Sequence, residues 1–139
     1  MWKALLIAIL LAGCAQLPPS PADLQARRFE AVPDKAVIYL VRDYPDFNDS
    51  AATLWLGETA MITTYPGTYY RWEVAPGQHR ISGYGHDVGA IIVRAEAGRL
   101  YFVMQRLAPF MRFPSSQLHL IAEPAGRAAV MRSVLVGGQ

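Results

Sequence analysis

Three histidines and one aspartate are the side chains in this sequence best suited to metal or acid–base chemistry. They are His79, His86, Asp87 and His119. Imidazole and carboxylate groups bind transition metals, and ligands from separate strands can converge on one ion. No pair has the short spacing of an HxH or HxxxH motif, and two of the histidines fall at polar positions of predicted strands. We therefore expect exposed or hydrogen-bonded histidines and predict no metal and no cofactor.

Serine chemistry lacks its usual partners in this sequence. A triad around His86 and Asp87 needs an activated serine, but no GxSxG elbow occurs and neither Ser115 nor Ser116 has an activating neighbour in sequence. The glycine-rich segment GYGHDVG, at residues 83–89, lacks the lysine of a phosphate-binding loop. We predict a non-catalytic protein, and a hydrolase or metal enzyme is the least favoured class.

The single cysteine, Cys14, points to a different chemistry. It follows one basic residue, Lys3, and an unbroken apolar run from Ala4 to Ala12. A short basic start, an apolar segment and small residues before a processing point are the parts of a secretory signal. The run is far shorter than the ~20 residues that a membrane-spanning helix needs.

Residues 11–14, LAGC, resemble the lipobox of bacterial lipoproteins. The resemblance implies cleavage before Cys14, a diacylglyceryl group on its sulfur and a further acyl chain on the new amino terminus. Several chains are needed because each buried methylene contributes only ~0.8 kcal/mol. Ala15 stands where an aspartate retains enterobacterial lipoproteins in the inner membrane, so we predict a Gram-negative outer membrane, facing the periplasm. The alternatives are a plain signal peptide and a buried helix with a core cysteine.

The charge is close to balanced, with 13 basic and 11 acidic residues and a formal net charge of +2. Removing the predicted signal peptide takes away one lysine and no acid. Binding to phosphate backbones needs a concentrated basic face, so we predict no nucleic-acid partner. With one cysteine no disulfide can form within the monomer, and the fold must rest on packing.

The chain divides into three segments of different amino-acid composition. Residues 1–13 form the predicted signal peptide, and residues 14–33 form the lipidated cysteine with a proline-rich tether. Residues 34–139 form the predicted β-sandwich domain with a short C-terminal helix. Within the tether, Ser20 as cap and Pro21 at the first helical position indicate a short helix.

Short β-rich runs separated by turn residues fill the domain. The run AVIYLVR, at residues 36–42, is continuous and apolar, as expected of a central strand buried on both faces. The later runs are ATLWLG, AMITT, TYYRWEV, QHRISGYG, AIIVRA, RLYFVMQR and SQLHLI, followed by the helical EPAGRAAVMRSVL. About eight strands without βαβ alternation predict an all-β fold, a single sandwich of mostly antiparallel strands. A barrel is the alternative.

Five segments succeed one another in a familiar order: AVIYLVR, LWLGE, YYRWEVAPGQHRIS, AEAGRLYFV and LHLIAE. In this order they resemble the bacterial envelope proteins of the domain-of-unknown-function family 2846 and, more loosely, PEGA-type modules. The resemblance covers residues 34–123 and implies a prealbumin-like or carboxypeptidase-regulatory-like sandwich attached to the envelope. It carries over no catalytic residue. The segments DYPDFNDS and QRLAPFMRFPSS depart from the family pattern.

Aromatic residues concentrate in two adjacent predicted strands. Trp55 and Tyr69 would form a platform for a glycan or a partner protein if both pointed away from the core, with Arg71 beside them. By strand alternation Tyr69 and Arg71 share one face, opposite Tyr70 and Trp72. Core packing is the competing explanation for most of these rings.

The segment 106–116 places three large apolar side chains between two arginines and two prolines. In chain order these residues are Arg106, Pro109, Phe110, Met111, Arg112, Phe113 and Pro114. The prolines argue against a regular central strand, so we expect the apolar side chains to cover one end of the sandwich. The alternative is contact with a membrane or a partner, with the arginines near lipid phosphates.

These observations favour a non-catalytic envelope lipoprotein, held to the membrane through Cys14, whose sandwich contacts another envelope protein or maintains the envelope. The alternative is a binding module for a glycan or small ligand. The residues expected to contact either partner are Trp55, Tyr69, Arg71 and Phe110.

Overall fold

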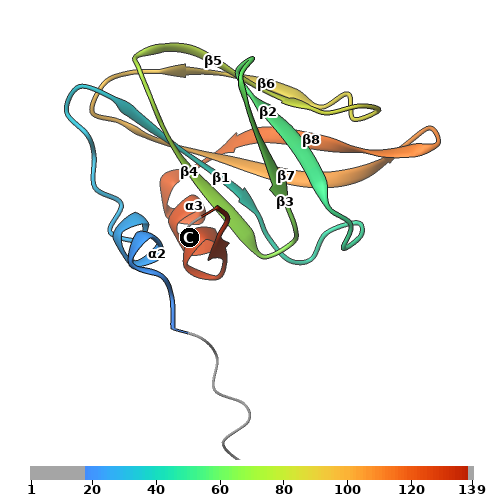
Figure 1. The fold of residues 1–139 in the computed structure, drawn as a ribbon, viewed down its shortest axis with the longest axis horizontal. Coiled ribbons are helices and arrows are strands. Elements are labelled where there is room, and N and C mark those ends of the chain that lie inside the picture. Colours follow the sequence, from blue (N-terminus) through green and yellow to red (C-terminus); the bar gives the residue numbers. More distant parts are fainter. Residues whose placement is uncertain (1–17, 138–139) are drawn as a thin grey trace, which may run out of the picture.

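The protein is a two-sheet sandwich with helices on one side (Figure 1). The computed structural model describes residues 18–137, so Cys14 and the predicted signal peptide lie outside the described residues. Within 18–137, one sheet has five strands and the other has four. The predicted all-β sandwich is therefore confirmed, with nine strands in place of about eight.

The larger sheet, sheet A, has the strand order β8-β7-β1-β4-β9. Its strands are β1 (Ala36–Arg42), β4 (Thr68–Val74), β7 (Leu100–Phe110), β8 (Phe113–Ile121) and β9 (Val134–Leu135). Strand β1 pairs antiparallel with β4 and parallel with β7, and all of its residues are buried. Its unbroken apolar sequence reflects this central position, because both faces of the strand are covered.

The smaller sheet, sheet B, has the order β3-β2-β5-β6, with every pair antiparallel. Its strands are β2 (Ala52–Leu56), β3 (Ala60–Thr64), β5 (Gly77–Gly83) and β6 (Ala90–Ala95). A turn with Gly57 at φ 64° joins β2 to β3, a backbone angle that glycine adopts without strain. Burial alternates along β2, β3 and β6, because one face packs on the core and the other does not.

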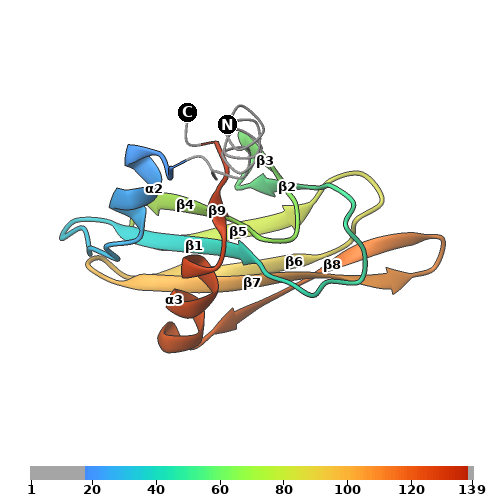
Figure 2. The ribbon, with the colours of Figure 1, turned by 90° about the horizontal axis from the view of Figure 1, so that it is seen from below.

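Two apolar cores hold the molecule together. The first lies between the sheets and includes Ile38, Leu40, Leu54, Ile81 and Val103. The second lies on the outer face of sheet A, under the helices, and its buried members are Ala26, Val37, Tyr39, Val41, Tyr69, Phe102, Met104, Ala129 and Val130. In Figure 2, which views the molecule from below, these helices lie in front of sheet A.

Helix α2 (Pro21–Ala26) forms where the sequence predicts it. Ser20 is the N-cap, and its Oγ accepts a hydrogen bond from the Asp23 backbone N–H at 3.1 Å. Ala26 is buried, and the ring of Phe29 lies 5.4 Å from that of Tyr39 on β1. The residues from Ser20 onward therefore pack on sheet A, although the sequence placed them in a tether.

Helix α3 (Glu123–Met131) closes the outer face of sheet A. Gly126 is buried in it, and a Cβ added there would lie 2.2 Å from Cγ of Phe102. The glycine therefore permits close approach of α3 to β7. Val130 is buried in the core on the outer face of sheet A, whereas Met131 is exposed. Neither helix described here is long and apolar enough to cross a membrane.

The hairpin of β7 and β8 differs from the expectation. Both strands run through their prolines, and Pro109 pairs with Pro114. Strand β1 pairs with β7 only as far as Met104, so the missing N–H of Pro109 removes no bond to a third strand. The apolar residues at the tip do not cover the end of the sandwich: Phe110, Met111 and Phe113 are exposed.

Candidate binding surfaces

The outer face of sheet B carries no helix within the described residues. Alternation along its strands points Trp55 and Met61 outward, and the two residues are cross-strand partners. Ile92 on β6 also points outward, and its exposed fraction of 56% matches the 52% of Met61. Large apolar patches on a protein surface are typical of binding sites, which makes this face a candidate. We call this surface, defined by these three residues with Arg80 and Arg94, the sheet B face.

The charged side chains of the sheet B face are both arginines. Arg80 lies opposite Ile92, and Arg94 lies opposite Gln78. None of the four strands contains an aspartate or glutamate. The sheet B face therefore combines apolar side chains with guanidinium groups. This combination suits a partner with apolar and acidic groups.

The residues predicted to bind do not come together. Trp55 lies on the sheet B face, whereas Tyr69 and Arg71 lie on the outer side of sheet A, next to α2. Tyr69 is fully buried, because helices cover that side. Arg71 is partly buried and its Nη1 donates to Glu73 Oε1 at 2.8 Å. Phe110 lies at a third place, the tip of the β7–β8 hairpin.

A buried polar cluster fastens α2 to sheet A. Tyr69 Oη donates a hydrogen bond to Asp23 Oδ1, and Arg27 Nε donates to the same oxygen at 2.7 Å. Burial alone would raise the pKa of Asp23, but the hydrogen bonds from Arg27 and Tyr69 outweigh it, and the pKa lies below its usual value. Burial, and then the Asp23 carboxylate, raise the pKa of Tyr69. Tyr69 is therefore a neutral donor inside the fold.

The histidines also stay apart. His79 on β5 has its Nε2 2.6 Å from the Ala75 carbonyl and lies edge-on to Trp72, with ring centroids 5.5 Å apart. His86 stacks on Phe113, and His119 lies on β8. Among residues 18–137, no group of three or more His, Cys, Asp or Glu side chains is arranged to hold a metal ion.

Aromatic contacts link the sheet B face to the hairpin tip through the loop 84–89. The ring of Tyr84 lies 6.3 Å from that of Trp55, at the edge of the sheet B face. Further along the loop, the His86 ring stacks on Phe113 with centroids 4.2 Å apart and planes 7° from parallel. The loop therefore contacts the sheet B face through Tyr84 and the hairpin tip through His86.

Asp87 fixes this loop to β8. Its Oδ1 accepts hydrogen bonds from Ser115 Oγ at 2.9 Å and from the Ser116 N–H at 2.8 Å, and its Oδ2 accepts from Ser116 Oγ at 2.6 Å. The Gly89 N–H also donates to Oδ1 at 2.9 Å. A Cβ on Gly89 would lie 2.1 Å from the Ser116 carbonyl oxygen, so the close approach requires glycine. Ser115 and Ser116, which have no activating neighbour in sequence, therefore hold β8 to this loop a few residues behind the hairpin tip.

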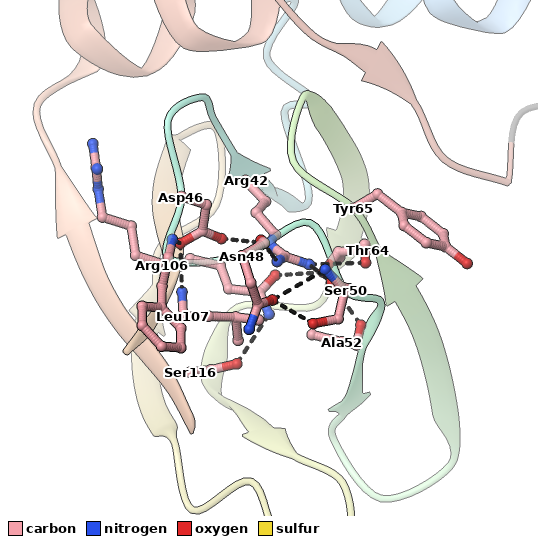
Figure 3. Close-up of polar contacts among 12 residues, drawn as sticks. Arg42, Asp46, Asn48, Ser50, Ala52, Thr64, Tyr65, Arg106, Leu107 and Ser116 are labelled. Carbon is pink, nitrogen blue, oxygen red and sulfur yellow. Dashed lines mark hydrogen bonds and ion pairs between the residues drawn. The ribbon is translucent and has the colours of Figure 1, made fainter. Parts of the chain in front are cut away.

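A second buried network begins at Arg42, which has no exposed surface (Figure 3). Its Nε donates to Asp46 Oδ2 at 2.6 Å, and its Nη atoms donate to the carbonyls of Asn48, Ser50 and Thr64. The other carboxylate oxygen of Asp46 accepts from the backbone N–H of Leu107 at 2.9 Å. One guanidinium therefore organises the whole acidic loop 43–50.

The Arg42 network continues into β7 and β8. Thr64 Oγ1 donates to Gln105 Oε1 at 2.7 Å, and Gln105 Nε2 donates to Ser116 Oγ at 3.0 Å. Ser116 then leads to Asp87. Every buried side-chain nitrogen and oxygen of the described residues has a hydrogen-bond partner. These polar groups are therefore engaged with one another and serve to position the loops.

These features define the class of the protein as a two-sheet β-sandwich with helices on one outer face and an exposed apolar-cationic sheet on the other. Comparison with known family models, with characterised proteins and with solved structures gave no match.

Sequence reasoning missed several residues of these surfaces. Met61, Ile92, Arg80 and Arg94 were not singled out, although alternation within their strands would have assigned them to one face. Tyr84 was also missed, because it lies in a loop and no periodicity places its ring near Trp55. The Arg42 network has one signal in sequence, an arginine that ends a strand and precedes an acidic loop.

Proposed function

We propose that this chain is a non-catalytic, lipid-anchored protein of a Gram-negative cell envelope, and that its sandwich binds a partner protein through the sheet B face. The lipobox-like sequence at Cys14 supports the anchor, and Ala15 favours the outer membrane facing the periplasm. The resemblance to family 2846 supports an envelope role. The observation that carries the binding function is the sheet B face, where Trp55, Met61 and Ile92 lie beside arginines without a carboxylate in the strands.

The outer faces of the two sheets differ in how well they are covered, and this difference supports the choice of the sheet B face. On sheet A the second apolar core is sealed by α2 and α3, and Tyr69 is covered. On sheet B the equivalent face has no such cover among the described residues and keeps large apolar side chains at half exposure. Burying these side chains against a partner contributes a favourable free energy of about 25 cal/mol for each Å² of apolar surface removed from water.

Affinity purification from native membranes in mild detergent tests the proposal. We expect a stoichiometric partner protein with the wild type and its loss with Trp55→Ala and with Ile92→Glu. Ile92→Glu replaces an apolar side chain of the face with a carboxylate opposite Arg80, and it opens no cavity because Ile92 is 56% exposed. Leu24→Ser is the matched control, since Leu24 is equally exposed but lies on α2. Wild-type protein recovered alone would overturn the proposal.

A glycan is the second candidate ligand. The tilted pair of Trp55 and Tyr84 offers ring faces at the edge of the sheet B face, next to Thr53 and Thr63, whose hydroxyls lie 3.0 Å apart. Rings beside hydroxyls suit the apolar faces and polar edges of sugars. Glycan binding that disappears with Tyr84→Ala, in a preparation without a protein partner, would favour this candidate.

A further inference from the structure

The tip of the β7–β8 hairpin is a separate surface with its own chemistry. The two strands pair as far as Phe110 and Phe113, and only Met111 and Arg112 form the turn. Figure 1 shows this hairpin extending past the other strands at one end of the sandwich. The tip is therefore a narrow projection, in contrast to the broad sheet B face.

The side chains at this projection are apolar and unusually exposed. Met111 has 94% of its surface exposed, and Phe110 and Phe113 have 46% and 49%. Val88, in the neighbouring loop, is 64% exposed. Together with His86 they border a hollow of about 460 Å³ at the tip.

The charges near the tip are positive. Residues 108–114 contain one charged side chain, Arg112, and no acid. Arg106 lies further down the same hairpin, with its Nη1 3.3 Å from the Pro45 carbonyl. The carboxylate of Asp87 does not line the hollow, because both of its oxygens accept hydrogen bonds from residues of β8 and the loop. The tip thus presents three apolar side chains together with the guanidinium of Arg112, and Arg106 lies further back along β7.

The part of the hairpin just behind the tip is held in place by hydrogen bonds. Asp87 binds Ser115 and Ser116 on β8, and Gln105 on β7 is tied through Thr64 to the Arg42 network. The His86 ring stacks on Phe113 and supports it from the side. The exposed apolar groups are therefore presented by a braced structure, so little conformational entropy is lost when they are buried.

We propose that this tip inserts into the headgroup region of a bilayer that contains anionic phospholipids. Met111, Phe110 and Phe113 reach the boundary of the acyl chains, and Arg112 and Arg106 lie near the lipid phosphates. A projecting apolar tip matches a deformable interface, whereas binding hot spots between proteins are generally enclosed in packed pockets. Long arginine side chains place their apolar stems in the interface and their charges at the phosphates. This contact is independent of the sheet B face and of any lipid on Cys14.

A fluorescent probe at the tip tests this inference in the full chain. Cys14→Ala leaves no other thiol, and Met111→Cys then accepts an environment-sensitive nitrobenzoxadiazole label at a side chain that is 94% exposed. A Glu58→Cys protein, labelled at the exposed β2–β3 turn, is the matched control. The vesicles contain phosphatidylethanolamine with phosphatidylglycerol, or phosphatidylcholine alone.

With anionic vesicles we expect a brighter, blue-shifted emission from position 111, quenching by lipids that carry a shallow nitroxide, and no change at position 58. Arg112→Gln should weaken the vesicle affinity read at position 111 about fivefold, since one arginine near an anionic surface contributes about 1 kcal/mol. An unchanged emission at position 111 while the protein sediments with the vesicles would overturn the proposal.

Two further outcomes also count against it. An equal response on phosphatidylcholine would overturn the anionic preference. A response only to a protein fraction of the envelope would make the tip a protein-binding surface. Trp55→Ala and Ile92→Glu should leave the signal at position 111 unchanged, so failure here and failure of the proposed partner binding are separate results.

Discussion

Arg42 is the residue whose burial most constrains the loop structure. Its side chain and that of Asp46 are 0% and 1% exposed, and the loop carbonyls satisfy the remaining guanidinium donors. Removing one member of a buried pair leaves the other charge without compensation in a medium of low polarity. The pair therefore fixes the 43–50 loop more firmly than an exposed ion pair would.

Asp46→Asn should lower the free energy of unfolding by about 3–5 kcal/mol, because it leaves the Arg42 charge buried without its counter-ion. Urea denaturation followed by tryptophan fluorescence measures the loss. Asp49→Asn is the matched control, since Asp49 is an exposed carboxylate of the same loop. Equal and small effects of the two substitutions would contradict a stabilising role for the buried pair.

Asp23 makes the attachment of α2 dependent on pH. Its pKa is lowered in the folded protein, because the hydrogen bonds from Arg27 and Tyr69 outweigh the opposing effect of burial. A lowered folded pKa means that the stabilisation is fully present above the unfolded value of about 3.9. The stabilisation is lost as the pH falls from there through the folded pKa.

The stability difference between the wild type and Asp23→Asn should therefore narrow with acidification. We expect a difference of about 1–3 kcal/mol at pH 7, from the loss of charge-assisted hydrogen bonds, and a progressive decrease as the pH falls below about 3.9 towards the folded pKa. Denaturant titrations of both proteins across this range give the comparison and cancel the titration of other carboxylates. A difference that stays constant with pH would contradict the assignment to ionised Asp23.

At the scale of elements, the approach of α3 to sheet A depends on one glycine. Glycine inside a helix is normally unfavourable by about 1 kcal/mol relative to alanine. At Gly126, however, the ring of Phe102 occupies the space that a Cβ would take. For Gly126→Ala, helix propensity therefore predicts a higher free energy of unfolding, whereas packing against Phe102 predicts a lower one.

Gly126→Ala should destabilise the fold by about 1–3 kcal/mol, because α3 must move away from β7 to admit the methyl group. Thermal unfolding followed by circular dichroism measures the sign. Ala128→Gly, at an exposed position of the same helix, should destabilise by about 1 kcal/mol through propensity alone. A stabilised Gly126→Ala protein would show that the contact with Phe102 is easily relaxed.

At the scale of the whole molecule, the sandwich has two different sides. Helices cover sheet A, the sheet B face carries apolar and cationic side chains, and the hairpin projects from one end. An anchor at the amino terminus would hold these surfaces close to a membrane. The chain preceding α2 supplies the only cysteine for such an anchor.

Cys14→Ala should abolish incorporation of a clickable palmitate analogue in a bacterial host and leave the precursor unprocessed at this position. The physical reason is that the thioether and the lipid-dependent cleavage both require the sulfur. In-gel fluorescence after labelling, with mass spectrometry of the amino terminus, measures both effects. Ala15→Ser keeps the sulfur and should still be labelled. A Cys14→Ala protein that is still labelled would contradict the lipobox interpretation.

Local sequence patterns predicted the central position of β1 and most other strands, but they missed β9 and the ends of β7 and β8 that contain prolines. The predicted features depend on local periodicity and on turn residues such as Gly57, which act over short distances along the chain. The sequence also indicated α2, because Ser20 and Pro21 are local cap signals, and it assigned Tyr69 and Arg71 to one face of β4. Trp55 and Phe110 were recognised as candidates by their residue type.

Which faces are open to solvent depends on tertiary packing. Tyr69 is buried because α2 and α3, distant in sequence, both pack on sheet A, and no periodicity in β4 reveals that cover. Phe110 is exposed because the hairpin outruns its neighbouring strand, which depends on where β1 ends. The partners of Asp46 and Asp87 are likewise set by contacts across the fold. Strand identity is a local property, whereas exposure depends on long-range packing, and that packing selects the surfaces available for binding.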